Sequence, residues 1–248
     1  MSPRILLLGG TTEASRMARA LAEAGLDAVF SYAGRTEMPL PQPLPTRIGG
    51  FGGVAGLAAY LRENAITHVI DATHPFAARM SRNAVLACAQ ERVRLLALER
   101  PAWVPGPGDD WREVETLEDA AAALPAEPAR IFLAIGRQGL GSFASRPEHA
   151  YLLRLVNAPG ALPLPQAEIV QDRGPFTLEN DLALLKRHRI EMLVAKNSGG
   201  AGGQAKLEAA RMLRLPVLMV TRPALPLRAA VATLEAALRW LHGTDLGV

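Results

Sequence analysis

The sequence has little cysteine, little aromatic side chain and almost no lysine. Among its 248 residues, Cys88 is the one cysteine, aromatic residues make up 5% and only three residues are Lys. A single cysteine excludes an intrachain disulfide, and a reducing compartment is the simplest interpretation. With so few aromatic residues, the core must be built from Ala, Leu, Val and Ile.

Long apolar runs are missing as well. The N-terminus offers only Ile5-Leu6-Leu7-Leu8 before two glycines, which is shorter than the roughly 7–15 apolar residues of a signal-peptide core. Nothing in the chain approaches the ~18 apolar residues of a membrane-spanning helix. We therefore expect a cytoplasmic protein.

Motifs of several common enzyme classes are absent. None of the three tyrosines has a lysine four residues later, which excludes the Tyr-x-x-x-Lys pair of short-chain dehydrogenases. The P-loop pattern GxxxxGK[ST] and the GxSxG elbow of hydrolases do not occur either. The chain has no HxxxH pair and its cysteine stands alone, so we predict no metal site.

The net charge of +3 is small and unevenly distributed. All of the excess lies in residues 1–100, which hold 11 Arg, no Lys and 8 acidic residues. A nucleic-acid-binding protein would show a basic stripe and clustered lysines. A small anionic ligand fits this excess better, although chance explains it equally well.

Apolar runs of strand length alternate with segments of helical periodicity along most of the chain. Strands are predicted at 5–8, 28–32, 47–48, 68–71, 94–98, 131–135, 151–156, 169–170, 192–195 and 217–220. Helices are predicted around 14–21 and 57–61, and over 76–91, 117–124, 177–188, 204–213 and 228–241. This alternation is typical of doubly wound parallel sheets with helices on both faces.

A stretch rich in Pro, Gly and Trp at residues 101–107 interrupts the alternation and predicts a domain linker. The expected organisation is two α/β domains, residues 1–100 and 101–248, each a doubly wound parallel sheet. A cleft between two such domains is a common ligand site.

Ligands of open parallel sheets bind beyond the carboxyl ends of the strands. Gly9-Gly10-Thr11-Thr12-Glu13 follows the first strand and begins a helix, a place that suits a phosphate. Alternatively, these glycines only let the helix pack on the strand. After the second strand, Ser31, Gly34, Arg35 and Thr36 stand where an NAD-binding fold carries Asp or Glu, which favours a 2′-phosphate and hence NADP(H); a solvated Arg35 is the alternative.

Two further loops of the first half are candidate ligand-binding loops. Four glycines in residues 49–53, Gly50 among them, let the backbone approach a cofactor or form a merely flexible loop. Asp71-Ala72-Thr73-His74-Pro75 follows a buried strand and precedes a helix. Thr73 and Pro75 suit the start of that helix, and His74 is either a donor to cofactor or substrate or a cap.

The second half offers one prominent loop, Lys196-Asn197-Ser198-Gly199-Gly200. In a chain with 24 Arg and three Lys, a lysine here favours a proton donor or an anion contact, with a solvated loop lysine as the alternative. Gly136-Arg137 and Arg222-Pro223 also follow strands. The tryptophans are interpreted as packing residues.

Taken together, these motifs resemble those of the precorrin-6A reductase family. The resemblance rests on GGTTE (9–13), SYAGRT (31–36), DATHPFA (71–77), Arg100-Pro101, KNSGG (196–200) and Arg222-Pro223, and it spans nearly the whole chain. It implies two Rossmann-like domains and an NADPH-dependent reduction of one double bond of precorrin-6A to precorrin-6B, in cobalamin biosynthesis. Members that act on the cobalt-containing analogue look alike, so the sequence does not reveal whether the substrate carries cobalt.

The resemblance also implies roles for individual residues. NADPH is expected at Gly9, Gly10, Thr11, Thr12, Glu13, Ser31, Gly34, Arg35, Thr36, Gly50, Thr73 and His74. Catalysis is assigned to His74, Lys196, Asn197 and Ser198, and substrate binding to Arg100, Gly136, Arg137, Lys196, Ser198, Gly199 and Arg222. We expect a monomer. The alternatives are another NADP-dependent reductase on the same scaffold and a non-catalytic two-domain anion-binding protein.

Overall fold

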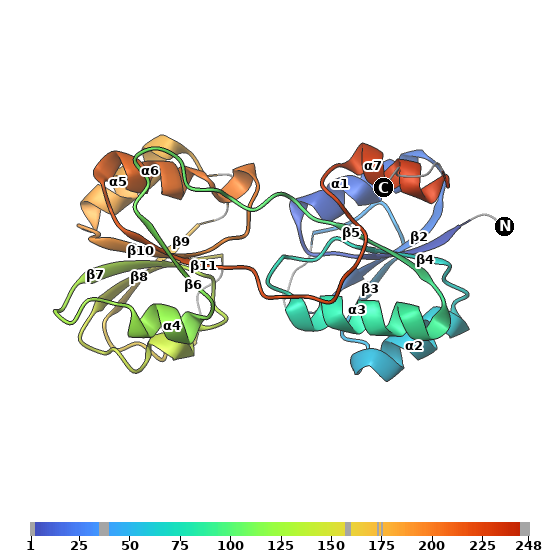
Figure 1. Cartoon of the computed structure of the whole chain (residues 1–248), viewed down its shortest axis with the longest axis horizontal. Coiled ribbons are helices and arrows are strands. Elements are labelled where there is room, and N and C mark those ends of the chain that lie inside the picture. Colours follow the sequence, from blue (N-terminus) through green and yellow to red (C-terminus); the bar gives the residue numbers. More distant parts are fainter. Residues whose placement is uncertain (1–2, 35–39, 157–159, 173, 175, 244–248) are drawn as a thin grey trace. The chain divides into compact units, whose positions relative to one another are not determined.

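A computed structural model describes residues 3–34, 40–156, 160–172, 174 and 176–243 of the chain. These residues form two compact units (Figure 1). Unit 1 consists of the described residues up to Pro101 together with those from Pro223 onward, and unit 2 of those between Ala102 and Arg222. No described helix is both long and apolar enough to cross a membrane.

Unit 1 is built on a six-stranded sheet in which all neighbours are parallel, in the order β12-β5-β4-β1-β2-β3. The strands are β1 (Arg4–Leu8), β2 (Asp27–Tyr32), β3 (Thr46–Ile48), β4 (His68–Asp71), β5 (Arg94–Leu98) and β12 (Ala230–Val231). Helices α1 (Thr12–Glu23) and α7 (Leu234–Leu241) cover one face, and α2 (Gly53–Glu63) and α3 (Ala78–Glu91) the other (Figure 1). The predicted doubly wound sheet is confirmed.

Unit 2 repeats this architecture with the order β6-β11-β10-β7-β8-β9, again all parallel. Its strands are β6 (Trp111–Val114), β7 (Arg130–Ala134), β8 (Ala150–Leu155), β9 (Ala167–Gln171), β10 (Met192–Lys196) and β11 (Val217–Val220). Helices α5 (Leu178–Arg187) and α6 (Ala205–Leu213) cover one face and α4 (Leu117–Ala122) the other (Figure 1). Two 3₁₀ helices, η1 (Leu140–Phe143) and η2 (Ala201–Gly203), complete the unit.

The C-terminal segment departs from the prediction in two ways. Residues 228–241 were expected to form one helix in the second domain, but β12 pairs with β5 and α7 begins only at Leu234. Ala237 and Trp240 of α7 are buried in the core of unit 1. The expected domain 101–248 is therefore wrong at its end, because this helix buries its apolar face against the first sheet.

The helix predicted to start at Phe76 also begins later. Its first residue is Ala78, and Ala77 stands at the N-cap without a side-chain hydrogen bond. Thr73 is not the cap and Pro75 is not in the first turn, because Thr73 is instead bonded to Asp71. Threonines cap both α1 and α5: Thr11 accepts from the Ala14 amide and Thr177 from the Asn180 amide.

Candidate active site

Strand order reverses between β1 and β4 in unit 1, so the loops after these two strands form the expected ligand position. The two loops are directly joined, because the Thr11 hydroxyl donates to the Ala72 carbonyl over 2.8 Å. The same hydroxyl oxygen accepts from the Ala14 amide at 3.1 Å and so caps α1. This bonding fixes the N-terminus of α1 against the end of β4.

The glycines that precede α1 are required by the backbone. A Cβ on Gly9 would lie 2.0 Å from Cζ of Phe30, and the Gly9 amide donates to the Ser31 carbonyl at 3.0 Å. Gly10 has φ +121° with open space around it. Gly9 therefore serves the packing of β1 beside β2, whereas Gly10 leaves the backbone at the start of α1 accessible.

Ser31, a predicted phosphate ligand, is buried and already bonded. Its hydroxyl accepts from Nη1 of Arg47 at 2.8 Å, and Arg47 also donates to the carbonyls of Gly49 and Gly50 at 2.9 and 3.2 Å. The Arg47 guanidinium stacks 3.8 Å above the Phe51 ring. Burial lowers the pKa of Arg47, although Tyr60 opposes this shift.

Arg47 is a residue that the sequence interpretation missed. The available signal was a single Arg within the short strand that precedes the glycines of 49–53. Gly34 adopts φ +74°. The predicted ligands Arg35 and Thr36 lie outside the described residues, so their role stays a prediction.

A buried carboxylate organises the loop after β4. Asp71 accepts from the hydroxyl and amide of Thr73 at 2.7 and 3.2 Å, and Arg228 donates to its other oxygen at 2.8 Å. Arg228 also donates to Glu99 at 2.8 Å. Thr73 is thus held in a tight turn by Asp71, which places His74 at the surface.

His74 is exposed, and its Nδ1 accepts from the Phe76 amide at 3.2 Å. The neutral ring therefore carries its hydrogen on Nε2 and presents a donor there. The remaining predicted residue of unit 1, Arg100, donates to Glu13 at 2.7 Å, with both side chains about one-fifth exposed. Glu13 lies in the first turn of α1, so Arg100 sits beside the predicted phosphate position.

In unit 2 the strand order reverses between β7 and β10, and the predicted loops follow these two strands. Gly136 has φ +73° after β7, and Arg137 is exposed. The Lys196 ammonium donates to the Gln138 carbonyl over a long 3.5 Å. Burial lowers the pKa of Lys196 below its ordinary value, so its proton is easier to release.

Asn197 and Arg222 hold this loop in place. The Asn197 side chain accepts from the Trp103 amide at 2.8 Å and donates to the Trp103 carbonyl at 2.9 Å. Arg222 donates to the carbonyls of Asn197 and Ser198 at 3.0 and 3.2 Å. Trp103, interpreted above as a packing residue, also donates from Nε1 to the Gly200 carbonyl at 2.9 Å.

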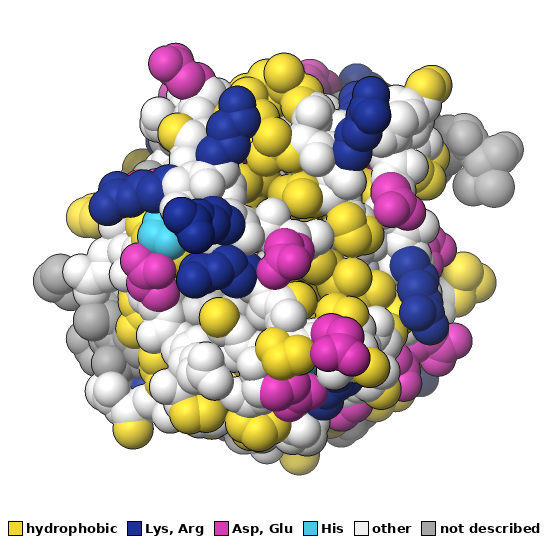
Figure 2. Space-filling model, turned by 90° about the vertical axis from the view of Figure 1, so that its left-hand side faces the viewer, with side chains coloured by type: hydrophobic (Ala, Val, Ile, Leu, Met, Phe, Trp, Pro, Cys, Tyr) yellow, Lys and Arg dark blue, Asp and Glu magenta, His cyan; other side chains and the backbone are white. Residues whose placement is uncertain are grey.

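A hollow of about 350 Å³ lies elsewhere in unit 2, at the amino ends of β7, β8 and β9. Arg130, Glu168 and His188 line it, and His188 and Glu168 are 2.9 Å apart. Figure 2, which faces unit 2, shows basic side chains gathered around one His on this side of the molecule. The hollow lies at the amino ends of the strands, whereas Lys196 lies at the carboxyl end of β10. It is therefore not part of the candidate active site.

The structure therefore brings the predicted residues together in two groups, one in each unit. Gly9 to Glu13, Thr73, His74 and Arg100 belong to the first, and Gly136 and Lys196 to Gly200 belong to the second, with Arg222 supporting them. The first group offers backbone donors at a helix N-terminus, which suit a phosphate. The second offers a half-buried ammonium, which suits proton transfer or an anion.

Comparisons with known proteins identify relatives over nearly the whole chain. Residues 4–242 match the model of the family described as Precorrin-6x reductase CbiJ/CobK. The chain is 60% identical to a precorrin-6A reductase of Rhodobacter capsulatus, over 99% of both chains. It is 41% identical to one of Mycobacterium tuberculosis, over 97% of this chain and 98% of the other.

Two further relatives extend the comparison. A cobalt-precorrin-6A reductase of Priestia megaterium is 31% identical, over 93% of this chain and 95% of the other. A solved structure of CobK precorrin-6A reductase superposes with a TM-score of 0.93 at 59% identity, over 98% of this chain and 97% of the other. The chain described here therefore belongs to the precorrin-6x reductase CbiJ/CobK family.

Proposed function

We propose that this protein uses NADPH to reduce one double bond of precorrin-6A, giving precorrin-6B, in cobalamin biosynthesis. Membership in the family makes the chain a reductase. The observation that carries the substrate is the 60% identity to a precorrin-6A reductase over 99% of both chains. The 31% identity to a cobalt-precorrin-6A reductase is lower, which favours the cobalt-free substrate. The cytoplasmic location and the monomeric state stay predictions.

The described residues of unit 1 fit NADPH. Gly10, Thr11 and Thr12 present backbone donors at the N-terminus of α1, where a pyrophosphate is stabilised. Ser31 to Gly34 supply no carboxylate at the end of β2, and Arg47 lies against Ser31. A cation at this place, with no carboxylate from Ser31 to Gly34 among the described residues, favours a 2′-phosphate over a 2′-hydroxyl, and Arg35 and Thr36 are assigned to the same phosphate.

Arg47 is therefore added to the predicted cofactor residues. Gly50 and Thr73 are assigned to the walls of the nucleotide position, because Arg47 holds the Gly50 carbonyl and Asp71 holds Thr73. When bound, NADPH supplies the hydride that the reduction requires.

A proton must follow the hydride, because addition to a conjugated imine places negative charge on nitrogen or carbon. Lys196 is suited to this step, since burial lowers the pKa of its ammonium. His74 offers an Nε2 donor at the surface of unit 1, and Ser198 a hydroxyl. Asn197 orients this loop through its two bonds to Trp103.

The carboxylates of the macrocycle require cationic partners. Arg137 is exposed after β7, and the backbone around Gly136 and Gly199 is glycine-rich and adopts positive φ. Arg100 and Arg222 keep their assignment to substrate carboxylates, but each already holds a partner, Glu13 and the Asn197 carbonyl respectively.

The test mixes the protein with precorrin-6A and either NADPH or NADH and records the spectra of macrocycle and nucleotide. We expect rapid reduction with NADPH and little with NADH. NADPH binding without reduction of precorrin-6A would indicate another NADP-dependent reductase. Absence of both binding and spectral change would indicate a non-catalytic anion-binding protein.

The role of Lys196 has its own test. Turnover that needs the protonated ammonium falls as pH rises through the lowered pKa of Lys196, so Lys196→Met should lower kcat and remove that alkaline limb. Lys186→Met is the matched control, because Lys186 is exposed at the end of α5. An unchanged pH profile in Lys196→Met would exclude Lys196 as the donor.

A further inference from the structure

The segment that joins the two units is anchored at two points only three residues apart. Arg100 donates to Glu13 of unit 1 at 2.7 Å. Trp103 exchanges two backbone hydrogen bonds with the Asn197 side chain of unit 2, at 2.8 and 2.9 Å. The Arg100 contact lies entirely within unit 1 and the Trp103 contacts entirely within unit 2. The two anchors are therefore connected through the covalent chain of residues 100–103.

The Trp103 end is firmly built into the Lys196–Gly200 loop. Besides its bonds to Asn197, the Trp103 indole donates to the Gly200 carbonyl at 2.9 Å, and the Lys206 ammonium lies 4.7 Å from the ring centroid. A Cβ on Gly203 would approach the same ring to 3.3 Å. A shift of Trp103 therefore has to move the loop that carries Lys196.

The ion pair of Arg100 with Glu13 lies where the charge of a bound ligand would act on it. Glu13 stands in the first turn of α1, where an anionic ligand is stabilised. A phosphate there would repel the Glu13 carboxylate and compete with it for the Arg100 guanidinium. Both side chains of the pair are only about one-fifth exposed, so solvent screens this change incompletely.

The chain between the two anchors, Arg100 and Trp103, is short. Only Pro101 and Ala102 lie between them. Proline fixes its own φ and restricts the residue before it to extended conformations, so Pro101 stiffens the chain next to Arg100. We therefore expect a displacement of the backbone at Arg100 to reach Trp103.

We propose that residues 100–103 are a positioning element that couples phosphate binding at the start of α1 to the geometry of the Lys196–Gly200 loop. Trp103 and Arg100 act through other residues in this role: Trp103 through Asn197 and Gly200, Arg100 through Glu13. The proposal rests on the proposed function for the identity of the phosphate ligand, NADPH. It predicts that a residue of unit 2 changes the affinity of a ligand bound in unit 1.

The test is a double-mutant cycle on NADPH affinity, measured by nucleotide fluorescence. Trp103→Phe keeps an aromatic ring but removes the indole donor to Gly200, and it should weaken NADPH binding about fivefold, within the usual range of coupling between sites. In an Arg100→Met background the same substitution should have no further effect. Trp111→Phe is the matched control, because the Trp111 Nε1 has no hydrogen-bond partner among the described residues.

Equal effects of Trp103→Phe in both backgrounds, or none in the native background, would overturn the proposal. Amide hydrogen exchange without ligand gives a second readout that does not depend on NADPH. Arg100→Met should speed exchange of the Trp103 amide, and unchanged exchange would also refute the coupling. If Trp103→Phe does not fold, Asn197→Asp takes its place, since it keeps the acceptor but loses the donor to Trp103.

The same measurements separate this proposal from the proposed function. If wild-type protein does not bind NADPH while Arg100→Met still speeds exchange at Trp103, the cofactor assignment fails and the mechanical coupling stands. If NADPH binds but the two positions behave independently, the coupling fails and the cofactor assignment stands.

Discussion

Replacing Arg228 by Met should destabilise unit 1 severely. Arg228 donates to Asp71 and to Glu99, each at 2.8 Å. The Asp71 side chain is only 1% exposed and that of Arg228 10%, so the pair is desolvated. The substitution keeps most of the aliphatic volume but leaves the Asp71 carboxylate buried without its cation.

The expected loss is about 3–5 kcal/mol, the usual cost of removing one partner of a buried ion pair. Thr73 still donates two hydrogen bonds to Asp71, which favours the lower half of that range. At ~1.4 kcal/mol per factor of ten, the unfolding equilibrium of unit 1 should shift by two to three orders of magnitude.

Amide hydrogen exchange resolved by peptide measures this loss on β4 and β5 without requiring the two units to unfold together. Arg16→Met, an exposed position of α1, should change stability by less than about 0.5 kcal/mol. Adding Asp71→Asn should recover much of the loss, because it removes the unpaired charge. A loss below 1 kcal/mol in Arg228→Met, or no recovery in the double variant, would refute the reasoning.

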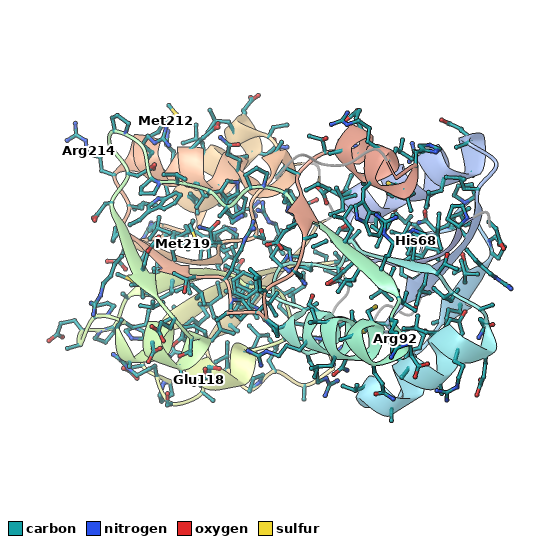
Figure 3. All side chains as sticks on the ribbon, turned by 45° about the vertical axis from the view of Figure 1, so that its right-hand side comes forward. His68, Arg92, Glu118, Met212, Arg214 and Met219 are labelled. Carbon is teal, nitrogen blue, oxygen red and sulfur yellow. The ribbon has the colours of Figure 1, made fainter. Side chains whose placement is uncertain are left out.

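Three further outcomes are expected. Gly9→Ala should cost about 1–3 kcal/mol in urea unfolding, because its Cβ would meet the Phe30 ring, and Phe30→Leu should relieve part of that cost; equal stability of Gly9→Ala and wild type would contradict the close packing. His68 lies in unit 1 (labelled in Figure 3), and burial and then Arg94 lower its pKa, so its contribution to stability is present above an ordinary pKa of about 6.5 and is lost as pH falls through the lowered value. His68→Gln should flatten the acid side of a plot of stability against pH, and an unchanged slope would oppose this assignment. Burial raises the pKa of the Cys88 thiol to about 12, so thiol reagents should leave the native protein unmodified and react only after unfolding; fast labelling of native protein would show that the site opens.

The central strands could be predicted because each is a short apolar run between polar segments. β1, β4 and β10 are buried on both faces, and such strands read as continuous runs of Leu, Ile and Val. β6 and β12 could not be found in this way. β6 is a four-residue edge strand with an exposed Arg and Glu at its centre, and β12 has two residues, so their places follow from pairing with distant strands rather than from local pattern.

In the candidate site, too, local features could be predicted from the sequence and contacts between distant residues could not. Glycines with positive φ after buried strands are visible in sequence, and the loops at Gly10, Gly136 and Gly199 follow this rule. The hydrogen bonds of Arg47 and Trp103 could not be predicted because their partners, Ser31 and Asn197, lie 16 and 94 residues away. Local sequence does not indicate which of many arginines, or which tryptophan, meets such a partner.

Chain connectivity explains why the boundary of the second domain was misplaced. In the first sheet, the sixth strand, β12, follows all of unit 2 in sequence, whereas the six strands of the second sheet, β6 to β11, are consecutive. A cut at residue 101 would remove β12, which pairs with β5, and α7, whose Trp240 completes the first core. It would also remove Arg228 and leave Asp71 without its cation. Because Asp71 fixes the turn at Thr73, the loop that carries His74 depends on a residue more than 150 positions later in the chain. The two units are therefore separate in packing but not in sequence, and the predicted nucleotide site needs both ends of the chain.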